Sequence, residues 1–154
     1  MNTLLKVTGF GKLISFYKYI YLNGPGVTRW AGVALILLAG FVHLVEAPEH
    51  FEFAGYLGAL FLLAFAGSLV AAFGILRGAR NWGWTLGAVI SGAALVAYLV
   101  SRFFGLPGFA EGAGRWDEPL GSLAMILEAA FLAGYFTVVT GLSIAYPETR
   151  DWHD

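Results

Sequence analysis

Histidine and carboxylate side chains gather in one short segment of this chain, between residues 43 and 52. They are His43, Glu46, Glu49, His50 and Glu52. Neutral imidazole and carboxylate groups together are the donors that zinc, copper(II), iron and manganese sites use. We therefore predict a metal site for copper, iron or zinc, with His43, Glu46, Glu49 and His50 as candidate ligands. The alternative is an acidic turn in which the same groups are structural or proton-linked.

A proline at position 48 lies between the two histidines. Proline disfavours a helical conformation of the preceding residue and suits the first position of a new helix. We therefore predict a helix break at Pro48, with Glu49 and His50 in the first turn of the next helical element. Glu49 would favour the positive end of that element. The break would allow His50 to fold toward His43.

Glu128 is an unusual carboxylate because it lies inside an apolar segment that begins near Pro119. At about 1.5 Å per residue, it lies roughly 13 Å along a helix, where an unpaired carboxylate is costly. Arg102 is the expected counter-charge, and His43 is the alternative. Tyr98, one turn before Arg102, would complete a hydrogen-bonded group. The Arg102–Glu128 pair would either lock the helices or support a pocket, in which Glu128 would be a further metal ligand.

Several other chemistries lack the residues that they need. The chain has no cysteine, which excludes disulfide scaffolds, thiolate metal sites and iron–sulfur clusters. Bis-imidazole haem requires two histidines at matching depth on separate helices, and only His43 lies within an apolar segment, so haem is disfavoured. No nucleophile elbow, P-loop or dinucleotide fingerprint is present. The net charge of -1 excludes a nucleic-acid partner.

The composition places these residues in a membrane protein. Of the 154 residues, 58% are hydrophobic and 12% are charged. A soluble domain is on average about 45–50% apolar and about 25% charged. The polar surface is too small to cover a water-soluble globule. We therefore expect an integral membrane protein whose first partner is the lipid bilayer.

Four apolar stretches are long enough, or nearly so, to cross a bilayer core that needs roughly 20 residues per helix. They are approximately Trp30–Val45, Phe53–Leu76, Trp82–Phe104 and Leu120–Tyr146. The first is short and should begin before Trp30. Because backbone groups in lipid must be bonded internally, four such stretches predict an all-α integral membrane protein with a bundle of four transmembrane helices.

Charged residues near the ends of these stretches predict their direction. Basic residues precede the first stretch and separate the second from the third: Lys6, Lys12, Lys18, Arg29, Arg77 and Arg80. The other two connections are mainly acidic, with Glu46, Glu49 and Glu52 in one and Glu111, Asp117 and Glu118 against Arg115 in the other. The positive-inside rule then places both termini in the cytoplasm and the candidate site on the extracytoplasmic side of a cell inner membrane.

The chain divides into three parts by this pattern. Residues 1–26 are expected to form a cytoplasmic interfacial helix, rich in Phe, Tyr and Ile, that ends at Asn23-Gly24-Pro25-Gly26. The alternative is an irregular arm that contacts lipid or a partner. Residues 27–146 form the four-helix transmembrane domain. Residues 147–154 form a polar cytoplasmic tail.

Small residues predict where the helices come together. Gly83, Gly87 and Ser91 repeat at four-residue spacing, which allows helix backbones to approach closely in lipid. Packing inside the bundle is the preferred interpretation, and a homodimer face is the alternative. Trp82 and Trp84 are expected in an interfacial aromatic belt.

Three of the motifs resemble a known group of proteins. His43-x4-Pro48-Glu49-His50-Phe51, Ser101-Arg102-x2-Gly105-Leu106-Pro107 and Glu128 on a fourth helix are similar to an uncharacterised family of small four-helix bacterial membrane proteins. That resemblance covers about Trp30 to Tyr146 and brings no established activity. More distantly, Arg29-x2-Gly32 and Gly40-x2-His43 resemble the first helix of DoxX-like proteins, which are associated with quinone-linked oxidoreductase systems.

Two functions follow as expectations. The first is a membrane-embedded site of His43, Glu46, Glu49, His50 and Glu128, supported by Tyr98 and Arg102, that binds a transition metal such as copper or iron, or a quinone-like redox ligand. The second is a non-catalytic accessory subunit that packs against a larger respiratory or photosynthetic membrane complex, or against another copy of itself.

Overall fold

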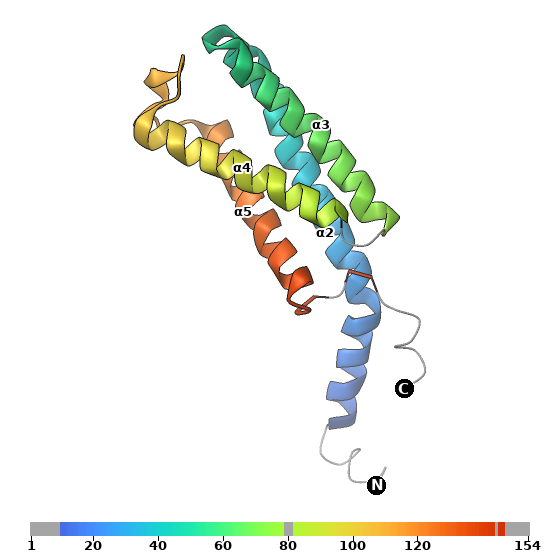
Figure 1. The fold of residues 1–154 in the computed structure, drawn as a ribbon. Coiled ribbons are helices and arrows are strands. Elements are labelled where there is room, and N and C mark those ends of the chain that lie inside the picture. The colour runs from blue at the N-terminus through green and yellow to red at the C-terminus, as the bar shows by residue number, and fades with distance from the viewer. Residues whose placement is uncertain (1–9, 79–81, 144, 147–154) are drawn as a thin grey trace.

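A computed structural model describes residues 10–78, 82–143, 145 and 146 of the chain. Within these residues the secondary structure is helical, with no strand (Figure 1). The helices are α2 (Phe10–Phe53), α3 (Gly55–Arg77), α4 (Trp82–Phe104) and α5 (Pro119–Val139), with a short turn of 3-10 helix, η1 (Ala110–Gly112), between the last two. All four long helices are long and apolar enough to cross a membrane. The predicted all-α class, with four helices long and apolar enough to span a membrane, is confirmed.

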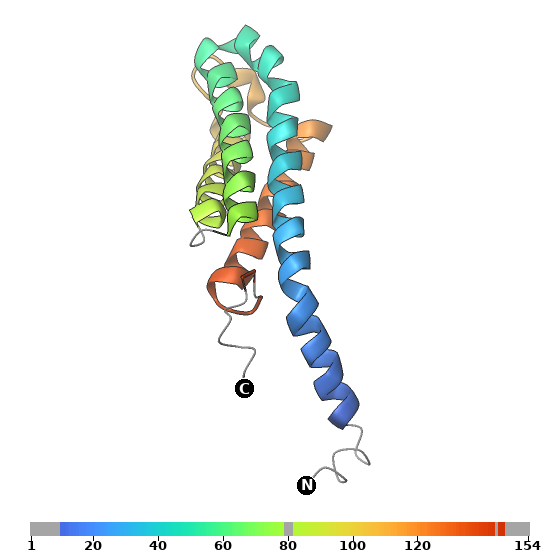
Figure 2. The same ribbon diagram turned by 90° about the vertical axis from the view of Figure 1, so that its right-hand side faces the viewer.

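The four helices pack side by side in a ring. α2 lies against α3 and α5, and α4 also lies against α3 and α5, so α2 and α4 face each other across the bundle with little direct contact (Figures 1 and 2). One end of the bundle holds Arg29, Arg77 and Tyr146, and we call it the basic end. The other end holds the last turns of α2 and the connection from α4 to α5, and we call it the acidic end.

Helix α2 continues through both of its prolines. The predicted break at Pro48 is wrong, because the helix ends at Phe53 and the extended residue is Ala54, with φ -159° and ψ 131°. Proline removes one backbone hydrogen bond and kinks a helix, and an otherwise apolar helix in a membrane protein accommodates this loss. Figure 2 shows the last turns of α2 bending over the acidic end toward α3.

From Phe10 onward, the N-terminal arm is part of α2 and not a separate helix. The helix expected to end at Asn23–Gly26 instead runs from Phe10 directly into the membrane-spanning part of α2, so the boundary at residue 26 is wrong for the helix itself. Pro25 is buried inside this helix. Residues 1–9 and the polar tail 147–154, which includes His153, lie outside the described residues.

The boundaries of the last two long helices differ in how well apolar composition predicted them. α4 occupies Trp82–Phe104 as expected, whereas α5 ends at Val139 rather than near Tyr146. Gly141 adopts a left-handed conformation with φ 74° just after the helix, which terminates a helix at low cost only when the residue is glycine. The backbone N–H of Ser143 then donates to the carbonyl oxygen of Thr137. Composition gave no sign of this end because the following residues are also apolar.

Glycines let the helices touch near the basic end. A Cβ atom added at Gly83 would clash with the α3 backbone at Gly74 and Ile75, and one added at Gly87 would meet the ring of Phe131 on α5 at 2.5 Å. These two glycines therefore allow close packing inside the bundle, which was the preferred interpretation of their spacing. Trp84 lies in the core, stacked on Phe131 with ring centroids 5.4 Å apart, so its predicted place in an interfacial belt is wrong.

The same two helices separate toward the acidic end. From their contact at Gly74 and Gly83, α3 and α4 diverge as the two arms of a V (Figure 1). The side chain of Ile90 still reaches the backbone of α3 at Gly67. Beyond that contact the facing side chains of α3 and α4 line a cavity.

Candidate functional site

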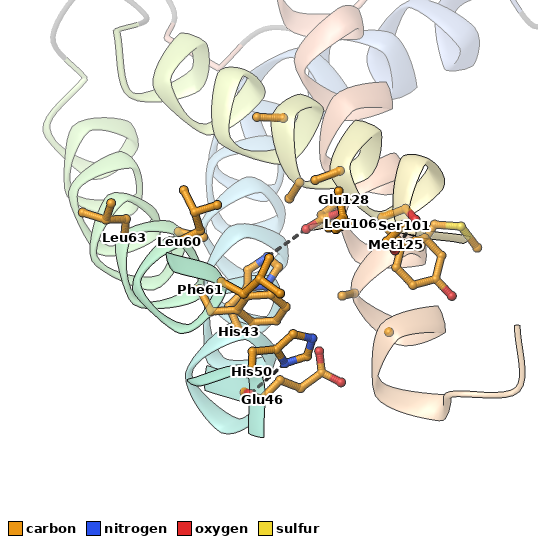
Figure 3. Close-up of a pocket in the computed structure, with 18 of the residues that line it drawn as sticks. His43, Glu46, His50, Leu60, Phe61, Leu63, Ser101, Leu106, Met125 and Glu128 are labelled. Carbon is orange, nitrogen blue, oxygen red and sulfur yellow. Dashed lines mark hydrogen bonds and ion pairs between the residues drawn. The ribbon is translucent and has the colours of Figure 1, made fainter. Parts of the chain in front are cut away.

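A cavity of about 530 Å³ lies between the helices toward the acidic end (Figure 3). All four long helices contribute to its wall. Its polar lining residues are His43, Glu46, His50, Tyr56, Tyr98, Ser101, Arg102, Glu118 and Glu128, and most of the remaining lining is Leu, Ala, Val, Ile and Phe. The cavity is therefore amphipathic, with an apolar region between α3 and α4 and a polar region near the acidic end.

The continuity of α2 explains which of its polar residues reach the cavity. His43, Glu46 and His50 are separated by three and four residues, so an uninterrupted helix presents them on one face. All three line the cavity. Glu49 is on another face, where it is exposed and does not line the cavity. The structure therefore places four of the five candidate ligands on the wall of one cavity, namely His43, Glu46, His50 and Glu128, and leaves Glu49 outside.

His43 and Glu128 form a buried pair across the bundle. The Nε2 atom of His43 lies 2.8 Å from the Oε1 atom of Glu128, and the two residues are 7% and 2% exposed. The expected Arg102–Glu128 pair is wrong, and the alternative partner, His43, is the observed one. Depth decides between them, because Arg102 is in the last turn of α4 at the acidic end whereas Glu128 lies well inside α5.

Arg102 instead belongs to a cluster at the acidic end. It donates to a carboxylate oxygen of Glu118 and, at 3.2 Å, to the carbonyl oxygen of Gly112, and its guanidinium lies 4.6 Å from the centre of the Tyr98 ring. Arg115 forms an ion pair with the other carboxylate oxygen of Glu118, at 3.0 Å. Buried arginine requires such partners, because an unpaired buried charge is strongly destabilising.

Glu118 is the site residue that sequence reasoning missed. We treated it only as one charge of an acidic connection, although it directly precedes Pro119, a residue typical of the first helical position. Glu118 is therefore fixed at the start of α5, beside the last turn of α4 that carries Arg102. The Glu-Pro pair was the signal that could have placed it.

An aromatic ring lies between the two imidazoles. The Phe61 ring is 5.2 Å from the His43 ring and stacks on the His50 ring at 3.9 Å (Figure 3). The Nδ1 atom of His50 donates to the carbonyl oxygen of Glu46 at 2.9 Å, which leaves its Nε2 free. Within the described part of the chain, no three His, Asp or Glu side chains come close enough to hold a metal ion. The copper, iron or zinc site stays a prediction that this geometry does not favour.

Three buried polar atoms around the cavity have no hydrogen-bond partner among the described residues. They are His43 Nδ1, the Tyr98 hydroxyl and Arg102 Nε. Buried polar groups in proteins are nearly always hydrogen-bonded, so each exception calls for an explanation. All three belong to residues that line this cavity. Each of these atoms is itself enclosed, so a bound molecule with polar atoms would supply the missing partners once the side chains turn toward it.

No protein-family model, curated protein or solved structure matches this chain. The resemblance to the four-helix bacterial family and to DoxX-like proteins therefore stays a prediction. The functional argument depends on the site alone.

Proposed function

We propose that this protein binds an amphipathic, quinone-like redox ligand, whose polar head group lies in the polar region of the cavity. The observation that carries the proposal is that three unpartnered buried polar atoms belong to residues that line one cavity with mostly apolar walls. Ligand sites are typically concave and mostly apolar, with a few polar groups that fix the orientation of the ligand. A volume of about 530 Å³ is within the usual range of such sites.

The available atoms favour a head group that accepts hydrogen bonds. The Tyr98 hydroxyl can donate, and Arg102 Nε can only donate. His43 Nδ1 also donates when the proton shared with Glu128 resides on the carboxyl group, or when the imidazole is doubly protonated. Carbonyl oxygens on opposite sides of a planar ring would satisfy such donors. This is the chemistry of a quinone.

The charge distribution supports an orientation for the site. Arg29 and Arg77 lie at the basic end, where Tyr146 contacts the Arg29 guanidinium at 5.8 Å and donates to the Ile75 carbonyl oxygen. The positive-inside rule places such an end in the cytoplasm. The cavity then lies in the extracytoplasmic half of a cell inner membrane, with both termini inside.

Binding of a 1,4-benzoquinone with a decyl chain tests the proposal. The purified chain is reconstituted in phosphatidylcholine nanodiscs, and quenching of tryptophan fluorescence is measured, since Trp116 lies 6.3 Å from the Tyr98 ring. We expect saturable binding that Tyr98→Phe weakens by roughly two- to tenfold, because one hydrogen bond contributes about 0.5–1.5 kcal/mol.

Ser91→Ala is the matched control. Ser91 is also on α4, and its hydroxyl is also buried and unpartnered, but it does not line the cavity. Equal effects of the two substitutions, or quenching that does not saturate, would refute the proposal. Metal analysis of the same preparation tests the predicted copper, iron or zinc site, and co-purification tests the predicted role as an accessory subunit.

A further inference from the structure

We infer that the cavity opens sideways into the lipid between α3 and α4, and that the ligand carries an apolar chain that lies in this opening. This inference rests on the proposed function and adds to it the class of ligand, a membrane-dissolved molecule with a chain rather than a water-soluble head group. It also adds the route by which the ligand arrives.

The exposure of the cavity wall supports a lateral opening. Leu60 and Leu63 of α3 and Val89 of α4 line the cavity, yet they are 53%, 67% and 63% exposed. Side chains that line a cavity and are also strongly exposed are expected at the edge of an opening. These residues lie in membrane-spanning segments, so the outside at that depth is lipid.

The residues on either side of the opening are suited to a flexible apolar chain. α4 contributes Ala93, Ala94 and Ala97, and α3 contributes Ala64 beside its leucines. Small side chains leave room where the helices diverge, while Ile90 against Gly67 closes the gap toward the basic end. The chain is therefore bounded on one side and free to leave into lipid on the other.

The polar region fixes the direction in which the chain points. His43, Tyr98 and Arg102 hold the head group on the α4–α5 side of the cavity, away from the opening. Lipid is as apolar as the groove, so the chain gains little free energy by moving from one to the other. Its contribution is to keep the ligand in the plane of the membrane at the depth of the opening.

The test compares two ligands with one head group, a dimethoxy-methyl-benzoquinone with and without a decyl chain. Ala93→Phe places a ring in the opening, and Val96→Phe places one on an exposed position of α4 that does not line the cavity. We expect Ala93→Phe to weaken binding of the decyl form by about tenfold or more through overpacking, and to change binding of the chain-free form by less than about twofold. Val96→Phe should leave both unchanged.

Each alternative gives a different pattern. Equal weakening of both ligands by Ala93→Phe, or of neither, would overturn the lateral opening while a Tyr98→Phe effect would still support the quinone site. If Tyr98→Phe does not weaken binding of either quinone, the proposed function is overturned, whatever the effect of Ala93→Phe. Comparing each variant with the parent for the same ligand cancels differences in partitioning into the bilayer.

A second measurement reports on the opening without any ligand. The chain has no cysteine, so a nitroxide can be attached at Ala97→Cys alone. We expect frequent collision with oxygen, which dissolves in lipid, little collision with a water-soluble nickel chelate, and a fall in oxygen collision when the decyl quinone binds. A label at position 97 that oxygen does not reach would show that lipid has no access to the gap.

Discussion

The two ends of this bundle are built on opposite principles. At the basic end, Gly83 lies on the α3 backbone, and Trp84 stacks on Phe131 with ring centroids 5.4 Å apart. At the acidic end, the same helices diverge beside a cavity of about 530 Å³ whose wall includes the buried pair of His43 and Glu128.

The difference shows how one helix pair can be both a rigid contact and a binding site. Close contact of glycine with backbone holds α3 and α4 together at one end through van der Waals packing, which is the main attraction between helices in lipid. At the other end, Arg102 of α4 pairs with Glu118 at the start of α5, and Tyr56 of α3 donates to the Pro107 carbonyl oxygen in the connection from α4 to α5. Stability should therefore depend on shape at the basic end and on pairing of polar groups at the acidic end.

The largest effect is expected from breaking the His43–Glu128 pair. His43→Leu or Glu128→Leu alone should reduce the free energy of unfolding by about 3–5 kcal/mol, because each leaves a buried polar partner uncompensated. The double variant should recover most of that loss, since an apolar pair of similar volume needs no partner. Unfolding of all three in detergent measures the coupling, and additive losses would contradict a direct interaction.

Crowding the basic end should have the next largest effect. Gly83→Ala adds a methyl group that would clash with backbone atoms of α3, which cannot move aside as a side chain can. We expect a loss of about 1–3 kcal/mol from overpacking. Gly92→Ala on the same helix has open space around it and should not destabilise the protein. Similar thermal stabilities of the two variants would show that the helices do not touch at Gly83.

The contribution of Tyr146 to stability should depend on alkaline pH. Its hydroxyl donates to the Ile75 carbonyl oxygen at 2.8 Å, so Tyr146→Phe should cost about 1 kcal/mol. Burial raises the pKa of Tyr146 above its usual value of 10.0. The folded state then holds this proton more tightly than the unfolded state, so the contribution is complete below pH 10 and decreases as pH rises beyond it. Denaturant titrations between pH 8 and about 11.5 should show a smaller alkaline loss in Tyr146→Phe than in the parent.

Filling the acidic end should have the smallest effect on stability. Ala97→Leu extends a side chain into the cavity rather than into a packed neighbour, and we expect a change within about 0.5 kcal/mol. A loss as large as that of Gly83→Ala would mean that the cavity is absent from the folded protein in a bilayer. Thermal unfolding of both variants in the same nanodiscs gives the comparison.

The sequence predicted the helices better than their ends. Apolar runs placed α4 at Trp82–Phe104, because lipid requires continuous internal hydrogen bonding over about 20 residues. The same runs missed the end of α5, which depends on the left-handed Gly141. The local preferences of proline predicted a break at Pro48, but α2 continues through it.

The sequence predicted most residues of the candidate site but not which of them pair. His43 and Glu128 were recognised as buried and His43 was named as one of two partners, yet the preferred pair was wrong because opposite charge was given more weight than depth. Helical spacing through Pro48 would have grouped His43, Glu46 and His50 and excluded Glu49. The cavity itself depends on how far α3 and α4 diverge, which no spacing within a single helix reports.

Because α3 and α4 touch closely at Gly83, a small change in their crossing angle there moves the far end of α4 by a larger distance. Ala97 lies roughly 21 Å along α4 from that contact, at about 1.5 Å per residue. A change of about 5° in the crossing angle there moves Ala97 by about 2 Å, which is comparable to the radius of a methyl group. Helix tilt responds to hydrocarbon thickness, so thinner and thicker bilayers should set different apertures between α3 and α4 without altering a single contact at the fulcrum.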